Sequence, residues 1–172
     1  MCIREASKTL STRGALLLRG GCFVLVLALV GACGVDRGDF IAGADYEPCK
    51  SNLPVCQQTA GCALGENKYI EGDFPGYRNF VVTTPADTVI VVKIFFETRQ
   101  HPGEDTEIIW YEPSCYDFYR YRSEGEDIFA IAGGDRVFER EQMVRNAGDH
   151  LVEVYSDAYA HYLIRVELKT PM

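Results

Sequence analysis

The stretch His161-Tyr-Leu-Ile-Arg-Val-Glu-Leu168 decides the fold of this chain. Its apolar side chains recur at every second position, and charged or polar ones stand between most of them. Successive side chains of a β-strand point to opposite faces, so the pattern predicts a strand with one buried and one solvated face. A shift of one residue would exchange the two faces, and the pattern therefore specifies the register strongly.

Similar runs, separated by turn residues, extend from this strand toward the N-terminus. The segment Thr88-Val-Ile-Val-Val-Lys-Ile-Phe-Phe-Glu97 is apolar on both faces apart from Lys93, which predicts a central strand covered on both sides. About eight strands at roughly 12-residue spacing predict an all-β fold, an antiparallel β-sandwich or jelly roll. The other expected strands are residues 68–71, 79–84, 106–112, 114–122, 127–132, 136–145 and 150–155.

The N-terminal segment has the layout of an export signal. Basic residues precede Cys22-Phe-Val-Leu-Val-Leu-Ala-Leu-Val-Gly-Ala-Cys33, and charge returns only at Asp36. A basic region, a short apolar region and small residues before a cleavage point are typical of a signal peptide. The uncharged stretch, residues 20–35, has 16 residues, whereas a membrane-spanning helix needs roughly 20.

The end of this segment, Val30-Gly31-Ala32-Cys33, resembles the lipobox of bacterial lipoproteins. The resemblance implies that residues 1–32 are removed as a signal peptide and that Cys33 receives a diacylglyceryl group and an N-acyl chain. Stable anchoring needs more than one chain, and this set is sufficient. Gly34 follows the cysteine where aspartate is associated with inner-membrane retention, so we expect the outer membrane of a bacterial envelope. The alternative is a secretory signal cut after Ala32, which leaves a soluble protein.

The mature chain has the size of one domain and an acidic surface. Its 140 residues contain 13 Lys and Arg against 24 Asp and Glu, a formal charge of −11. This charge and the lack of a basic stripe argue against nucleic-acid binding. We expect a flexible tether over residues 33–48, a cysteine-bounded segment over 49–66 and the β-sandwich over 67–170. A flexible tether of this length spans roughly 20 Å.

Four cysteines remain after lipidation: Cys49, Cys56, Cys62 and Cys115. An even number in an oxidising compartment predicts two disulfides, with three possible connectivities. The pairing we favour is a local Cys49–Cys56 loop and a Cys62–Cys115 bridge to the main domain. A zinc site is the weaker alternative, because the spacing lacks the close C-x2-C pairs of zinc ribbons.

Near the C-terminus, Gly148-Asp-His-Leu-Val-Glu-Val-Tyr155 and Tyr162-Leu-Ile-Arg-Val166 are similar to the closing hairpin of bacterial pre-peptidase C-terminal domains. His150 departs from the family, which usually has an aromatic residue at that position. The resemblance implies a β-sandwich that ends in this hairpin. It also implies a non-catalytic binding or targeting module.

The sequence offers little for catalysis. It has no H-E-x-x-H, no G-x-S-x-G and no phosphate-binding glycine loop. Ser156, Asp157 and His161 invite a triad interpretation, but three such residues around one turn more often cap it. A metal-binding pair of His150 and His161 across the final hairpin lacks a third ligand. We therefore expect a protein that is not an enzyme and needs no cofactor, with a small hydrolase as the less favoured alternative.

Binding is the favoured role. Aromatic and arginine side chains on outward strand faces can form a glycan or protein contact surface. The alternative is that the aromatic side chains cover the sandwich core. The candidate binding residues are Trp110, Tyr111, Tyr119, Tyr121, Arg120 and Arg122.

Acidic loops are a second lead. Ca²⁺ takes oxygen ligands from such loops, although no loop here has the EF-hand register, and solvated acidic turns that aid solubility are the favoured explanation. We therefore expect a non-catalytic envelope lipoprotein, an accessory component of an envelope or surface assembly with protein or glycan partners. The alternative is a carbohydrate- or calcium-dependent adhesion module.

Overall fold

A computed structural model of the chain describes residues 35–49, 53–56, 59–97, 104–123 and 137–170. The chain divides into two compact units, residues 1–33 and 34–172, and the described residues all belong to the second. The signal peptide, Cys33 and the strand expected at residues 127–132 lie outside the described residues. Among the residues described, no helix is long and apolar enough to cross a membrane.

The described residues form one short helix and eleven strands. Eight of the strands, β4 to β11, lie within residues 67–170, where we expected about eight, and the all-β class is confirmed. Three shorter strands precede them. The elements are α1 (Arg37–Phe40), β1 (Asp45–Tyr46), β2 (Leu53–Val55), β3 (Thr59–Ala63), β4 (Lys68–Asp73), β5 (Gly76–Thr84), β6 (Thr88–Phe96), β7 (Thr106–Tyr111), β8 (Phe118–Arg122), β9 (Val137–Val144), β10 (Gly148–Ser156) and β11 (His161–Lys169).

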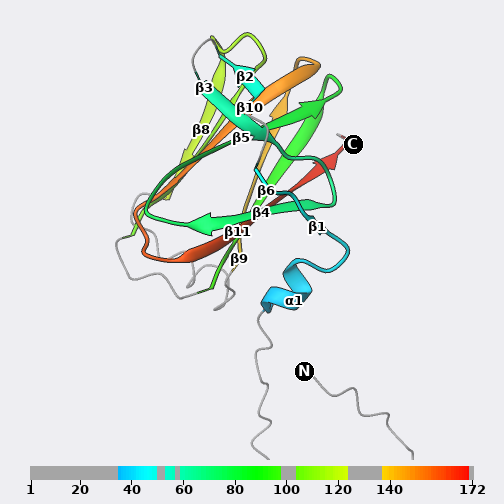
Figure 1. The fold of residues 1–172 in the computed structure, drawn as a ribbon. Helices are drawn as coiled ribbons and strands as arrows, with labels where there is room; N and C mark the ends of the chain where they lie inside the picture. Colours follow the sequence, from blue (N-terminus) through cyan, green and yellow to red (C-terminus); the bar gives the residue numbers. More distant parts are fainter. Residues whose placement is uncertain (1–34, 50–52, 57–58, 98–103, 124–136, 171–172) are drawn as a thin grey trace, which may run out of the picture. The chain divides into compact units, whose positions relative to one another are not determined.

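The strands form a sandwich of two sheets (Figure 1). The five-stranded sheet has the order β1-β4-β11-β6-β9, and the six-stranded sheet has the order β2-β3-β5-β10-β7-β8. Pairs within β4 to β11 are antiparallel, whereas the short β1 and β3 pair in parallel with β4 and β5.

The core lies between the two inner faces and follows the expected alternation. In β11 the buried residues Ile164 and Val166 face the core, and β6 contributes Ile90, Val92 and Ile94. Ile164 pairs with Ile94 of β6 on one side and with Ile70 of β4 on the other. β6 is a central strand whose apolar residues are buried except for Val89, in agreement with its two-sided apolar pattern.

The prediction that the last two strands form a closing hairpin is wrong. β10 belongs to the six-stranded sheet and β11 to the five-stranded sheet, so the chain crosses between sheets at residues 157–160. Both strands have a strong period of two, but periodicity does not tell which sheet a strand joins. His150 on β10 and His161 on β11 are therefore not paired across one hairpin.

Residues 35–48 also differ from the flexible tether we expected. Phe40 of α1 is buried against Phe95 and Leu163 on the outer face of the five-stranded sheet. Asp36 caps α1, its carboxylate accepting a hydrogen bond from the Asp39 amide at 2.8 Å. The segment is rich in glycine and aspartate and has no sustained hydrophobic period. One buried aromatic residue, Phe40, makes no periodic pattern from which its docking on the sheet could be predicted.

Candidate functional site

The connection between β7 and β8 is a tight turn at the edge of the six-stranded sheet. The amide of Cys115 donates to the carbonyl of Glu112 at 2.7 Å, and Pro113 occupies the second position, where its fixed φ suits such a turn. The Glu112 amide in turn donates to the Asp117 carbonyl at 2.9 Å. Strand β8 therefore begins at Phe118 and not at residue 114 as the alternation indicated.

The turn is covalently attached to the β2–β3 hairpin. The disulfides are Cys49–Cys62 and Cys56–Cys115, and the pairing we favoured, Cys49–Cys56 with Cys62–Cys115, is wrong. The reason is that β3 joins the sheet beside β5, which places Cys62 in the core at 1 % exposure. Cys56 lies in the turn between β2 and β3, which is free to reach the surface turn that holds Cys115.

The hairpin folds over the outer face of the six-stranded sheet. Val81, Ile109 and Leu151 point outward by strand alternation, yet they are buried and lie outside the main core cluster. β2 contacts β10, although two strands separate them in the sheet. β3 approaches β5 so closely that a Cβ on Gly61 would stand 2.9 Å from the Phe80 Cα. The Cys56–Cys115 bridge therefore holds the β2–β3 hairpin across this face as a strap.

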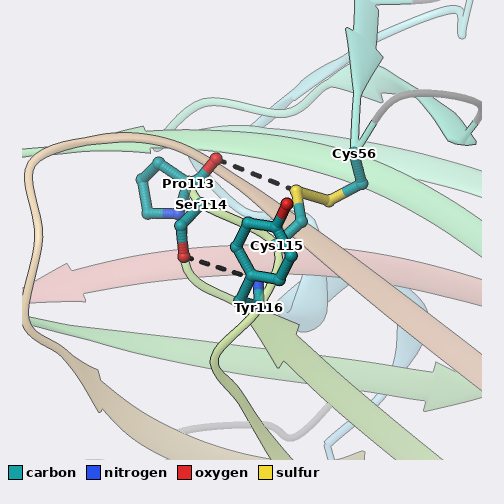
Figure 2. A pocket seen from close by; sticks show the side chains of 5 residues that line it. All are labelled: Cys56, Pro113, Ser114, Cys115 and Tyr116. Atoms are coloured by element: carbon teal, nitrogen blue, oxygen red, sulfur yellow. Dashed lines mark hydrogen bonds between the residues drawn. A yellow bond between two sulfur atoms is a disulfide. The ribbon is translucent and has the colours of Figure 1, made fainter.

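A pocket of about 380 Å³ lies at the bridge (Figure 2). Both half-cystines have left-handed backbone, with φ of 58° at Cys56 and 62° at Cys115. This conformation costs a non-glycine residue about 1–2 kcal/mol, so the surrounding structure must enforce it. Tyr116 on the rim is 83 % exposed. The lining residues are Cys56, Pro113, Ser114, Cys115 and Tyr116.

Glu112 holds the other side of the turn. Its carboxylate is buried and accepts hydrogen bonds from the Arg145 amide at 2.8 Å and from the Asn146 amide and side chain at 3.2 Å each. Burial by itself raises the pKa of Glu112, but these hydrogen bonds and His150 outweigh it and the net pKa is lowered. No sequence pattern predicts this role, because a glutamate before a proline is an ordinary surface residue.

His150 is a buried member of the same hydrogen-bond network around Glu112. It is fully buried, with Nε2 2.9 Å from the Asn146 carbonyl and Nδ1 3.2 Å from the Tyr111 carbonyl. Its Nδ1 also lies 3.9 Å from Glu112 Oε2. On the adjacent side, a Cβ on Gly148 would stand 3.1 Å from Pro113 Cγ, so the start of β10 packs directly on the turn.

We call residues 112–118 the clamped turn. A disulfide holds its middle, a buried carboxylate holds its start, and β8 pairing with β7 holds its end. Phe118 is 52 % exposed and packs its ring 5.7 Å from Tyr111. A second pocket of about 300 Å³ lies on this side of the turn, lined by Glu112, Asp117, Phe118, Tyr119, Arg145 and Asn146.

The predicted binding residues separate by strand alternation. Trp110 is in the core at 2 % exposure, and Tyr119 and Tyr121 pack against that core. Trp110 is therefore wrong as a surface contact residue, and the two tyrosines follow the core-covering alternative. Tyr111, Arg120 and Arg122 lie on the opposite, outward face.

The outward arginines are engaged with acids. Arg120 Nε lies 2.8 Å from Glu107 Oε1, and Arg122 Nη2 lies 2.7 Å from Asp105 Oδ2. Glu153 stands on β10 beside this group, and burial first, then the charge of Glu107, raises its pKa. Burial first, and then the charge of Glu153, raises the pKa of the Tyr111 phenol.

The residues considered for catalysis have structural roles. The Ser156 hydroxyl is buried, donates to the Asp105 carbonyl at 3.1 Å and lies 3.2 Å from the Thr106 hydroxyl. His161 lies on the five-stranded sheet, not on the sheet of Ser156, and its Nδ1 is 2.9 Å from Asp73 on the neighbouring strand β4. In the described part of the chain, no group of three or more His, Cys, Asp and Glu side chains is placed to hold a metal ion.

No protein-family model and no curated protein matches the sequence. Among solved structures, the pre-peptidase C-terminal domain of collagenase from Bacillus anthracis is similar, with 15 % identity and a TM-score of 0.44 over 68 % of this chain and all of that one. PliG from Aeromonas hydrophila, a periplasmic inhibitor of g-type lysozyme, has 14 % identity and a TM-score of 0.36 over 62 % of this chain and 96 % of that one. Neither is close enough to transfer a function.

Proposed function

We propose that this protein is a non-catalytic lipoprotein of a bacterial envelope that binds another envelope protein through the clamped turn. The observation that carries the proposal is the combination of restraint and exposure at that turn. Tyr116 and Phe118 are 83 % and 52 % exposed, while the backbone beneath them is held by a disulfide and by a buried carboxylate.

Restraint of this kind favours tight binding. A loop that is already ordered loses little conformational entropy on association, so more of the contact energy appears as affinity. Tyrosine and phenylalanine contribute large contact areas with few rotatable bonds, and aromatic residues are enriched at the centres of protein interfaces. The pockets on the two sides of the turn could receive complementary side chains of a partner.

The catalytic alternative has little support in the described residues. Ser156 and His150 are buried and hydrogen-bonded to main-chain carbonyls, and His161 is on a different sheet from His150. An activated serine needs a base within hydrogen-bond reach, and the partners of Ser156 are the Thr106 hydroxyl, the Asp105 carbonyl and the Ala158 amide. These side chains stabilise turns and strand ends.

The envelope address rests on the lipobox-like Val30-Gly31-Ala32-Cys33. A lipid anchor on Cys33 keeps the protein at the membrane surface, where its effective concentration toward other envelope proteins is high. The proposed role is therefore that of an accessory subunit, retained by lipid and recruited through the turn.

The test is a crosslinked pull-down of tagged, membrane-anchored protein from its native envelope. We expect a reproducible partner set that is lost when Tyr116→Ala and Phe118→Ala are combined. Tyr159→Ala is the matched control, because Tyr159 is 84 % exposed and lies in the β10–β11 connection outside the clamped turn. A partner set that survives the double substitution contradicts the assignment to the turn, and the lack of any protein partner leaves the glycan alternative.

A further inference from the structure

The N-terminal attachment of the domain has a geometric consequence. Val35 packs with Ile41 against the cluster of Phe40, Phe95 and Leu163 on the outer face of the five-stranded sheet. We call this outer face, with α1 on it, the anchor face. Only Gly34 separates Val35 from Cys33, and two Cα–Cα steps span at most about 7 Å.

α1 is held on the anchor face by contacts to three strands. Arg37 forms ion pairs with Glu71 of β4, at 2.8 Å, and with Glu97 just beyond β6. Arg165 of β11 donates from Nη1 to the Phe40 carbonyl at 2.7 Å. The Phe40 ring lies 5.5 Å from Phe95 of β6. A helix of four residues has no stability alone, so these contacts are what hold α1, and Val35 before it, on the anchor face.

We infer that the anchor face is turned toward the bilayer leaflet that holds the acyl chains of Cys33, and that the clamped turn points away from it. The inference rests on the proposed lipidation. The acylated cysteine lies at the boundary of headgroups and acyl chains, so a reach of about 7 Å keeps the anchor face at headgroup level. The flexible tether of roughly 20 Å expected from the sequence would impose no such orientation.

The sandwich core separates the two surfaces. α1 covers the outer face of the five-stranded sheet, while the clamped turn and its strap belong to the six-stranded sheet (Figure 1). Packed sheets lie about 10 Å apart, and side chains on the two outer faces add to that separation. A partner that binds the clamped turn would thus approach from the side opposite the membrane.

The charges of the anchor face agree with this placement by lipid alone. Lys93 is paired with Glu139 at 3.4 Å and Glu167 at 2.8 Å, and Lys169 is paired with Glu141 at 3.0 Å. Cations already engaged by neighbouring acids add little attraction for anionic headgroups. The orientation therefore follows from the short covalent connection, and a soluble form of the domain should not bind vesicles through this face.

The test uses the purified lipidated protein in vesicles of phosphatidylethanolamine and phosphatidylglycerol that carry a nitroxide on the headgroup. A bimane probe is placed at Glu141→Cys on the anchor face or at Tyr77→Cys on the far face. Both positions are exposed and lie on outward strand faces, Glu141 on β9 and Tyr77 on β5. We expect several-fold stronger quenching at position 141, and equal quenching or the reverse order overturns the orientation.

Two controls separate this inference from the proposed function. An insertion of 15 Gly and Ser residues between Gly34 and Val35 should abolish the difference between the probes while the protein still floats with the vesicles. A protein that does not float is not lipid-anchored, which refutes the envelope anchor and the orientation together. A protein that floats but shows no difference between the probes refutes the orientation alone.

Discussion

At the residue scale, strand alternation decides which aromatic and arginine side chains of β7 and β8 reach the surface. Tyr111, Arg120 and Arg122 lie outward and Trp110, Tyr119 and Tyr121 inward, because each strand presents every second residue to the core. The alternation is visible in the sequence, but it does not tell which of the two sets of alternate residues faces the core, because both sets contain aromatic residues. Phe118, two residues before Arg120, lies on the outward half and was missed.

Glu112 provides a prediction on stability. Glu112→Gln removes a buried acceptor of three hydrogen bonds and places amide hydrogens against donors, which should lower the free energy of unfolding by about 2–4 kcal/mol at pH 7. The folded-state pKa of Glu112 is lowered, so its stabilisation is complete above the ordinary glutamate pKa and is lost as the pH falls through the folded pKa. Urea unfolding of the Cys33→Ser protein at pH 7 and in acid should show the deficit shrinking. An equal deficit at both contradicts this.

Glu153 should behave in the opposite sense. Its folded-state pKa is raised, so the ionised form is disfavoured by folding, and stability is lost as the pH rises through that pKa. Glu153→Gln should therefore raise the free energy of unfolding at pH 7, by less than about 1 kcal/mol because the side chain is partly solvated. Thermal unfolding at pH 7 and pH 3 measures it. A gain that persists at pH 3 would show that the charge is not the cause.

At the element scale, the disulfides mark what the sequence could not decide. Cysteine count and compartment predicted two bridges, but the pairing depended on β3 joining β5 and carrying Cys62 into the core. The same limit applied to α1, whose docking rests on Phe40 and on ion pairs from strands far away in the sequence. Non-local contacts of this kind leave no local pattern.

The Cys56–Cys115 bridge closes a separation of 59 residues and clamps the proposed binding element. Replacing both cysteines by serine should cost about 4 kcal/mol in the chain-entropy model, and it should release the turn. We expect faster amide exchange over residues 112–118 and weaker partner capture. The matched control removes the other disulfide, Cys49–Cys62, whose cysteines are 13 residues apart in the sequence. In that variant Cys49 is replaced by serine and the buried Cys62 by alanine. Equal loss of partner capture in both variants would assign the effect to general stability.

At the scale of the whole molecule, α1 lies on the outer face of the five-stranded sheet, and the clamped turn belongs to the six-stranded sheet. The all-β class and most of the strands from β4 to β11 were predictable, because runs that alternate or are apolar on both faces recur there between turn residues. The sheet to which each strand belongs was not, and that assignment decides which surface carries α1 and which carries the clamped turn.

The most direct test of the central claim is site-specific photocrosslinking in the native envelope. A photoreactive phenylalanine replaces Tyr116 in one strain and Tyr159 in another, two positions of equal exposure at 83 % and 84 %. We expect a discrete crosslinked adduct with another envelope protein at position 116 and none at position 159. Adducts at position 159 alone, or the same adducts at both positions, would contradict a binding site on the clamped turn.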